Sequence, residues 1–129
     1  MRERHSHFLK DSSGGSLAEF AMVVPVFIGL VFGIIHFSYV VYAQATLNAA
    51  VEAAARCISL GTDCTDSTTT TSYASSHYQG PNVGQVFAYS APTTGSCANM
   101  KKVSATGAYK VNVVVTSITI NLSARSCYP

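Results

Sequence analysis

Residues 20–42 read FAMVVPVFIGLVFGIIHFSYVVY, which is 23 residues without an aspartate, glutamate, lysine or arginine. As a helix rising about 1.5 Å per residue, this stretch is roughly 34 Å long, enough to cross a hydrocarbon core of about 30 Å. A long helix of a soluble protein normally shows a polar face, whereas here His36 and Ser38 are the strongly polar interruptions. The stretch therefore predicts a membrane-spanning helix, and Tyr39 and Tyr42 fall where an interfacial aromatic belt is expected.

The charged residues around this stretch predict its orientation. Five of the fourteen charged side chains lie within residues 1–14, and the next basic residue after the apolar stretch is Arg56. Because cytoplasmic flanks carry an excess of Lys and Arg, we expect the N-terminus in the cytoplasm and the C-terminal region outside. A cleaved secretory signal is the alternative, since Ala43-Gln44-Ala45 has the A-x-A form, but such a signal has only about 7–15 apolar residues.

The whole composition narrows the class of protein. The chain has 129 residues, of which 48% are hydrophobic and 11% charged, and its net charge is +2. That charge content is under half of the usual value of about 25%, which excludes an ordinary disordered chain. The basic residues form no dense cluster, so we expect no nucleic-acid partner.

The membrane helix is expected to continue beyond residue 42. After that point the polar residues recur every four positions, and Glu52 can pair with Arg56 one helical turn later. We predict a polar stripe formed by Gln44, Asn48, Glu52 and Arg56. The opposing apolar stripe is formed by Leu47, Val51, Ala54 and Ile58. The apolar stripe is either one face of a small domain or a helix assembly surface. Gly61 can serve as the C-cap, so the helix is expected to end near residue 59.

The remaining residues predict a loop and then a β region. Residues 60–82 are rich in Ser and Thr and are expected to form a loop with one short helical turn near 73–78. Within residues 83–129 we expect strands at 86–89, 100–105 and 109–122, with a turn at Thr106-Gly107. The apolar alternation changes phase after Val115, which predicts a bulge or bend near residues 114–117; two strands in different sheets are the alternative.

Four cysteines follow the apolar stretch, on the side predicted to be outside. An even number in an oxidising compartment predicts two disulfides, for which three pairings exist. We favour Cys57–Cys64, which closes the loop at the helix end, and Cys97–Cys127, which ties the last strand to the sheet. The spacing contains no C-x-x-C, so a zinc site is not expected. The sequence thus predicts an α+β fold, with one long N-terminal helix and a small disulfide-stapled antiparallel β region.

The sequence does not predict an enzyme. It contains no G-x-S-x-G, H-E-x-x-H or Walker loop, and its outer part has one imidazole, His77. His5 and His7 lie close together within residues 1–14, but the sequence nearby supplies no further ligands for a metal. We therefore expect no catalytic residues, no metal, no cofactor and no small-molecule substrate.

The residues before and within the apolar stretch carry a family resemblance. The order of these features resembles a type IV prepilin N-terminus: a basic leader comes first, then a glycine, four uncharged residues, and Glu-Phe at the start of an apolar helix. More specifically, the chain resembles the TadE-like family of tight-adherence (Flp) pilus assembly proteins, through Gly14-Gly15-Ser16-Leu17-Ala18-Glu19-Phe20-Ala21-Met22-Val23-Val24-Pro25. The stretch from Ala45 to Arg56, with its small residues and Asn48-Ala49-Ala50, is also similar to the family. The resemblance covers residues 14–56.

The resemblance implies a pilin-like minor pilin or pseudopilin that a prepilin peptidase processes. Residues 1–14 would be a cytoplasmic leader, and cleavage after Gly14 would place Glu19 fifth in the mature chain; the Gly14-Gly15 doublet leaves the scissile bond open by one residue. Residues 15–59 would form the membrane-spanning and extended helix. Glu19 and Phe20 would set the register of assembly. The protein would lie in the bacterial inner membrane, and other pilins would be its partners.

Three residues of the span are candidates for helix packing. Gly29 and Gly33 form a G-x-x-x-G, which permits close approach of another helix, although small residues are common in membrane helices. Pro25 is expected to bend or loosen the helix locally. The alternative to a pilus subunit is a single-pass, membrane-tethered binding module or adhesin without a pilus role.

Overall fold

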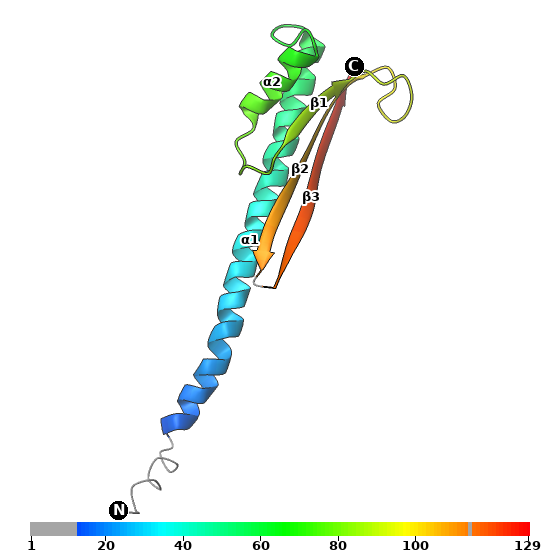
Figure 1. The fold of residues 1–129 in the computed structure, drawn as a ribbon. Coiled ribbons are helices and arrows are strands. Elements are labelled where there is room, and N and C mark those ends of the chain that lie inside the picture. The colour runs from blue at the N-terminus through cyan, green and yellow to red at the C-terminus, as the bar shows by residue number, and fades with distance from the viewer. Residues whose placement is uncertain (1–12, 114) are drawn as a thin grey trace, which may run out of the picture. The chain divides into compact units, whose positions relative to one another are not determined.

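The computed structural model describes residues 13–113 and 115–129 (Figure 1). Its elements in chain order are α1 (Ser13–Leu60), α2 (Ser67–His77), β1 (Val86–Ser90), β2 (Lys101–Val113) and β3 (Thr116–Tyr128). The chain divides into two compact units, residues 1–36 and residues 37–129. The predicted α+β class, with a long apolar N-terminal helix and a small antiparallel sheet, is confirmed.

The described part of the first unit is the N-terminal half of α1. Its large apolar side chains are exposed, as in Phe20, Phe27 and Phe32. Among the described residues, α1 is the helix that is long and apolar enough to cross a membrane. Such a surface is unfavourable in water and suits a lipid or protein environment.

The second unit begins with the C-terminal half of α1, which supplies one side of the core. The predicted stripes are present: the apolar stripe is buried, and Leu47 and Val51 are almost inaccessible to solvent. On the opposite side, Glu52 and Arg56 form an exposed ion pair. Several of the buried positions on this part of α1 are alanines: Ala43, Ala50, Ala54 and Ala55.

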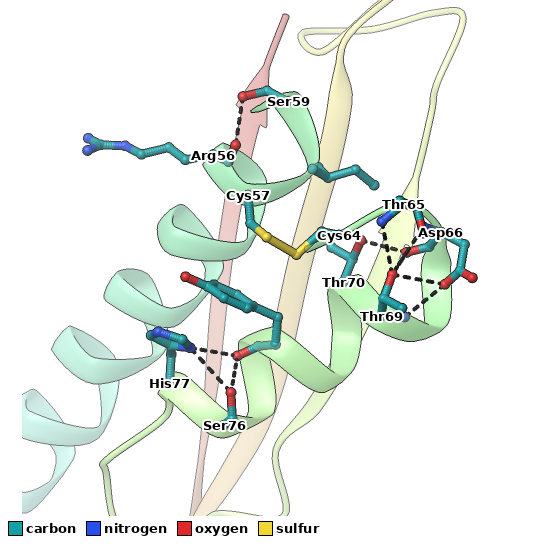
Figure 2. Close-up of a disulfide and its surroundings, with 12 residues drawn as sticks. Arg56, Cys57, Ser59, Cys64, Thr65, Asp66, Thr69, Thr70, Ser76 and His77 are labelled. Atoms are coloured by element: carbon teal, nitrogen blue, oxygen red, sulfur yellow. Dashed lines mark hydrogen bonds between the residues drawn. A yellow bond between two sulfur atoms is a disulfide. The ribbon is translucent and has the colours of Figure 1, made fainter. Parts of the chain in front are cut away.

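The end of α1 follows the predicted geometry. Gly61 has a φ of +66°, and its N–H donates to the carbonyl of Cys57 at 3.1 Å. A glycine adopts this left-handed conformation without the steric cost of a Cβ. Cys57 then pairs with Cys64, with 5.5 Å between the two Cα atoms, and Figure 2 shows this disulfide linking the end of α1 to the segment that begins α2.

The Ser/Thr-rich segment forms a regular helix, and the prediction of a loop with one helical turn was wrong. Asp66 caps α2: its carboxylate accepts from the Thr69 N–H at 2.8 Å, and the Thr69 hydroxyl accepts from the Asp66 N–H (Figure 2). Thr70 and Ala74, one turn apart, are buried. The capping box and this buried face outweigh the weak helix propensity of the Ser/Thr run.

The sheet has the order β1-β2-β3, and both pairs are antiparallel. The predicted turn at Thr106-Gly107 is wrong, because β2 runs straight through these residues. A Cβ on Gly107 would lie 2.7 Å from Cγ2 of Val83, whose carbonyl accepts from the Ala108 N–H at 2.8 Å. Gly107 therefore permits a close approach of the chain before β1 and does not mark a reversal.

The phase change after Val115 marks a hairpin, so the predicted bulge or bend within one strand is wrong; residue 114 of that range lies outside the described residues. Val113 pairs with Thr116, and Tyr109 pairs with Ile120. Odd-numbered residues of β2 consequently face even-numbered residues of β3. The apolar residues of one face of the sheet are therefore odd-numbered in β2 and even-numbered in β3, because the chain reverses between the two strands.

The second disulfide joins the loop between β1 and β2 to the end of β3. Cys97 pairs with Cys127, with 5.7 Å between their Cα atoms. Together with Cys57–Cys64, this is the pairing that the sequence favoured. The predicted boundaries between leader, long helix, loop and β region, at residues 14, 59 and 82, stay predictions. In the described structure α1 ends at Leu60, and the first strand starts at Val86.

Candidate pilus-assembly segment

The predicted processing residues lie at the start of α1. The helix begins at Ser13, so the backbone of both Gly14 and Gly15 is helical. The rest of the leader, including His5 and His7, lies outside the described residues. A Cβ on Gly15 would meet no neighbouring atom within 4 Å. Gly14 and Gly15 are thus small residues in the first turn of α1, with open space around Gly15.

Glu19 and Phe20 are both exposed on α1. Since the helix begins at Ser13, its first turn contains no acidic residue and Glu19 lies beyond it. The helix macrodipole, whose effect falls off within the first turn, is therefore a weak explanation for a carboxylate at this position. A charge directly before an apolar span of this length needs another partner when it enters a membrane or a helix bundle.

The candidate packing residues lie further along the same exposed surface. The α-helix continues through Pro25, which removes one backbone donor. Gly29 and Gly33 lie one turn apart, and a Cβ built on either would meet nothing within 4 Å. The absence of side chains at both positions leaves a shallow surface on which a second helix can approach closely. The structure contains one chain, so the roles of these residues stay predictions.

Four polar contacts fix α1 to the outer region, and the sequence did not single them out. The Gln44 side chain donates to the Ser123 carbonyl at 2.8 Å, and the Tyr42 hydroxyl donates to the Gln79 carbonyl at 3.0 Å. Lys101 Nζ donates to the Ile58 carbonyl at 2.7 Å, and the Arg56 guanidinium lies 6.0 Å from the Tyr128 ring centroid. These partners are distant in sequence, which is why local patterns gave no signal for them.

The outer region has an open groove and a tyrosine whose pKa is shifted. A groove beside the end of α1 is lined by small and polar residues, with Arg56 and Tyr73 among them, but Arg56 is already paired with Glu52. Within the described ranges, 13–113 and 115–129, no cluster of three or more His, Cys, Asp or Glu side chains could hold a metal. Burial raises the pKa of Tyr78 above its ordinary value of 10.0, and its hydroxyl donates to the Pro81 carbonyl at 2.6 Å. That tyrosine anchors the turn after α2.

The comparison with protein families identifies the helical segment. Residues 14–56 match the model of the family described as TadE-like protein, as the resemblance predicted. The match covers about a third of the 129 residues and lies entirely within α1. No curated protein and no solved structure matches the chain. A membrane-associated subunit of a pilus system is the function that this match and the apolar helix fit.

Proposed function

We propose that this chain is a minor pilin or pseudopilin-like subunit for assembly of a tight-adherence (Flp, type IVb) pilus. The observation that carries the proposal is the coincidence of the TadE-like match at residues 14–56 with a single continuous helix. In that helix the large apolar side chains from Phe20 to Phe37 are mostly exposed, and a buried stripe further along holds a folded outer region. A subunit that is anchored in a membrane and later packs through its helix requires both parts.

Leader removal is the first step of the proposed function. A prepilin peptidase of the inner membrane cuts after Gly14 and releases residues 1–14, with the N-terminus in the cytoplasm. The new N-terminus at Gly15 bears an ammonium group, and Glu19 becomes the fifth residue. The small residues on both sides of this bond, with open space around Gly15, support access to it.

Glu19 then sets the register between subunits. An unpaired carboxylate at the edge of a hydrocarbon region is costly, and a neighbouring subunit's ammonium group compensates that cost. Phe20, which is 68% exposed, adds an apolar contact next to the charge pair. The pair forms at one axial offset, because moving the subunits by a few ångströms separates the charges in a medium of low polarity.

The outer region supports an extracytoplasmic location. Two disulfides staple residues 57–129, and such bonds persist in oxidising compartments. The core of the second unit is built by residues 43–55 of α1 together with residues 74–124, so this unit can stay folded while the membrane half of α1 changes its surroundings. We propose no catalytic step, and the chain acts through contacts with the membrane, the peptidase and other pilin subunits.

The register role can be tested with Glu19→Ala and Glu19→Gln in cells that carry the pilus system. We expect both variants to lose their leader normally but to disappear from the sheared surface fraction, because the charge pair is absent. Glu52→Ala is the matched control: it removes an exposed carboxylate of the same helix, and we expect normal incorporation. Normal incorporation of both Glu19 variants would refute the register role.

A membrane-tethered binding module or adhesin is the second candidate. It is favoured by the end of the family match at Arg56, which leaves residues 57–129 without a family assignment. For an adhesin outside any pilus, the chain would stay in the membrane fraction and keep its leader whether or not the peptidase is present.

A further inference from the structure

A groove outside the core is formed by β2, β3 and one side chain of α1. Its volume is about 480 Å³, which is within the usual range of small-molecule sites. All of its lining residues belong to the second unit, so the groove is part of the folded outer region. The polar side chains that line it are Asn48, Lys102, Ser104, Thr106, Ser123 and Arg125.

The strand register places the two cations of the groove near each other. Val103 and Ala105 are buried in the core. Because side chains alternate between the two faces of a strand, Lys102 and Ser104 lie on the opposite face of β2. Arg125 pairs with Ser104 across the strands and is therefore the diagonal neighbour of Lys102. Diagonal neighbours lie about 7–8 Å apart, so two long side chains at these positions can reach a single anion.

Both of these cations can accept an anionic ligand. Within residues 13–113 and 115–129, neither Lys102 nor Arg125 forms an ion pair or a hydrogen bond. The other basic side chains at this end of the sheet are engaged, since Lys101 donates to a backbone carbonyl of α1 and Arg56 pairs with Glu52. The charge of the groove is thus not neutralised within the described chain.

The surroundings of the groove also favour an anion. Among the described residues that line it, none is acidic. The sequence contains no Asp or Glu from residue 67 to residue 129. The carboxylate of Glu52 lies one helical turn beyond Asn48, but its charge is compensated by the ion pair with Arg56. A negative group in the groove is therefore attracted by two cations without a facing carboxylate that repels it.

The neutral side chains of the groove supply hydrogen-bonding groups beside the cations. Gln44 Nε2 donates to the Ser123 carbonyl at 2.8 Å and to Asn48 Oδ1 at 3.3 Å. Because the amide oxygen of Asn48 is engaged, its NH₂ group is the part left for a ligand. Thr106 and Ser123 are exposed and pair directly across the strands. Their hydroxyls can both donate and accept, which suits the hydroxyl groups of a sugar or polyol.

We propose that this groove binds a phosphorylated sugar or polyol, with the phosphate between Lys102 and Arg125. The guanidinium supplies a planar fork of donors and the ammonium a point charge, and phosphate oxygens accept from both. The hydroxyls of the ligand then contact Asn48, Thr106 and Ser123. A free phosphorylated sugar and the repeating unit of a phosphate-containing surface polymer share this chemistry. The inference goes beyond the pilus role and does not depend on it.

Binding is measured by calorimetric titration of the full chain in a polyoxyethylene detergent, whose headgroup contains neither sugar nor phosphate. The ligands are glucose-6-phosphate, inorganic phosphate, glucuronate and glucose, in a phosphate-free buffer of low ionic strength. We expect glucose-6-phosphate to bind about tenfold more tightly than inorganic phosphate or glucuronate, and glucose to bind least. If glucose-6-phosphate does not bind at millimolar concentration, or binds no better than glucose or glucuronate, the proposal is overturned.

Charge removal locates the phosphate. Lys102→Gln and Arg125→Gln are each expected to weaken glucose-6-phosphate binding about tenfold, because each removes charge-assisted hydrogen bonds. Lys110→Gln is the matched control: it removes a cation from the same face of β2 outside the groove, and we expect unchanged affinity. An equal loss in all three variants indicates a diffuse attraction and overturns the site, as does unchanged affinity in all three. Arg125→Lys, which keeps the charge but loses the fork, repeats the test if Arg125→Gln does not fold.

Two further variants test the sugar contacts. Asn48→Ala and Thr106→Val are each expected to weaken glucose-6-phosphate binding about threefold and to leave inorganic phosphate binding unchanged. Equal effects on both ligands, or no effect on either, would overturn the assignment of these side chains to the sugar.

A polymer of glycerol phosphate distinguishes the two sources of the ligand. Tighter binding per phosphate group than for glucose-6-phosphate supports a surface polymer, and weaker binding supports a soluble sugar phosphate. These titrations use purified protein and involve neither leader removal nor assembly. A failure of this inference therefore leaves the proposed pilus role standing, and a failure of that role leaves the groove to be tested in the same way.

Discussion

Gly107 lies in β2 where the chain that leads into β1 crosses close to the strand. Its hydrogen leaves room for Val83, which is buried in the core. A glycine beside a threonine is a common turn signal, and the sequence alone favours that reading. The neighbour that explains it is 24 positions away along the chain, so no local pattern predicts it.

We predict that Gly107→Ala destabilises the protein by about 1–3 kcal/mol, because its Cβ collides with Val83. The free energy of unfolding is measured by denaturant titration of the full chain in detergent micelles. Val83→Ala removes the colliding methyl groups, so the double variant should lose less than the sum of the two single losses. Additive losses would show that the collision is not the cause.

Asp66 is the residue that makes the Ser/Thr-rich segment helical. The Thr69 backbone N–H and hydroxyl hold the pKa of its carboxyl below the ordinary value of 3.8. Asp66→Ala removes the cap, and we expect the thermal midpoint at neutral pH to fall by roughly 5 °C. Asp63→Ala, which removes a nearby carboxylate outside the cap, should change the midpoint little.

The lowered pKa of Asp66 gives this contribution a defined pH dependence. The stabilisation is present above the unfolded-state pKa and is lost as the pH falls through the lower folded-state pKa. The difference in thermal midpoint between the parent chain and Asp66→Ala should therefore shrink below about pH 4 and vanish at still lower pH. A difference that persists in strong acid would mean that the cap does not depend on the ionised carboxylate.

At the scale of elements, α1 was the most predictable part. Its predicted features depend on residues three to four positions apart, and all of them are present: the polar and apolar stripes, the Glu52–Arg56 pair and the Gly61 cap. α2 was missed because Thr and Ser have weak helix propensity, while its stability comes from a cap and a buried face. The β2–β3 hairpin was missed because a phase change in alternation fits a bulge and a reversal equally well.

The two disulfides close loops of different length, with sequence separations of 7 and 30 residues. In the chain-entropy account, the longer loop gains more from cross-linking, and the difference here is about 1 kcal/mol. We predict that Cys97→Ser with Cys127→Ser lowers the free energy of unfolding more than Cys57→Ser with Cys64→Ser. Denaturant titration of both double variants in micelles compares them; a larger loss from the shorter loop would contradict the entropic explanation.

At the scale of the whole molecule, the candidate assembly segment could be read from the sequence because its signals are local and linear. The apolar span, Glu19-Phe20 and Pro25 stand in fixed spacing within residues 14–56, and the family match covers the same residues. What the segment binds could not be read in the same way. The partners of Glu19, Gly29 and Gly33 in the proposal belong to other molecules, and one chain does not contain them.

The proposed function depends most directly on leader removal. The measurement is the intact mass of the membrane-extracted protein, from cells with and without the prepilin peptidase. The account predicts loss of residues 1–14 only when the peptidase is present, and a further mass change on reduction that corresponds to two disulfides. An uncut chain in both strains, or a chain that begins at Thr46 as after signal-peptide cleavage, would contradict it.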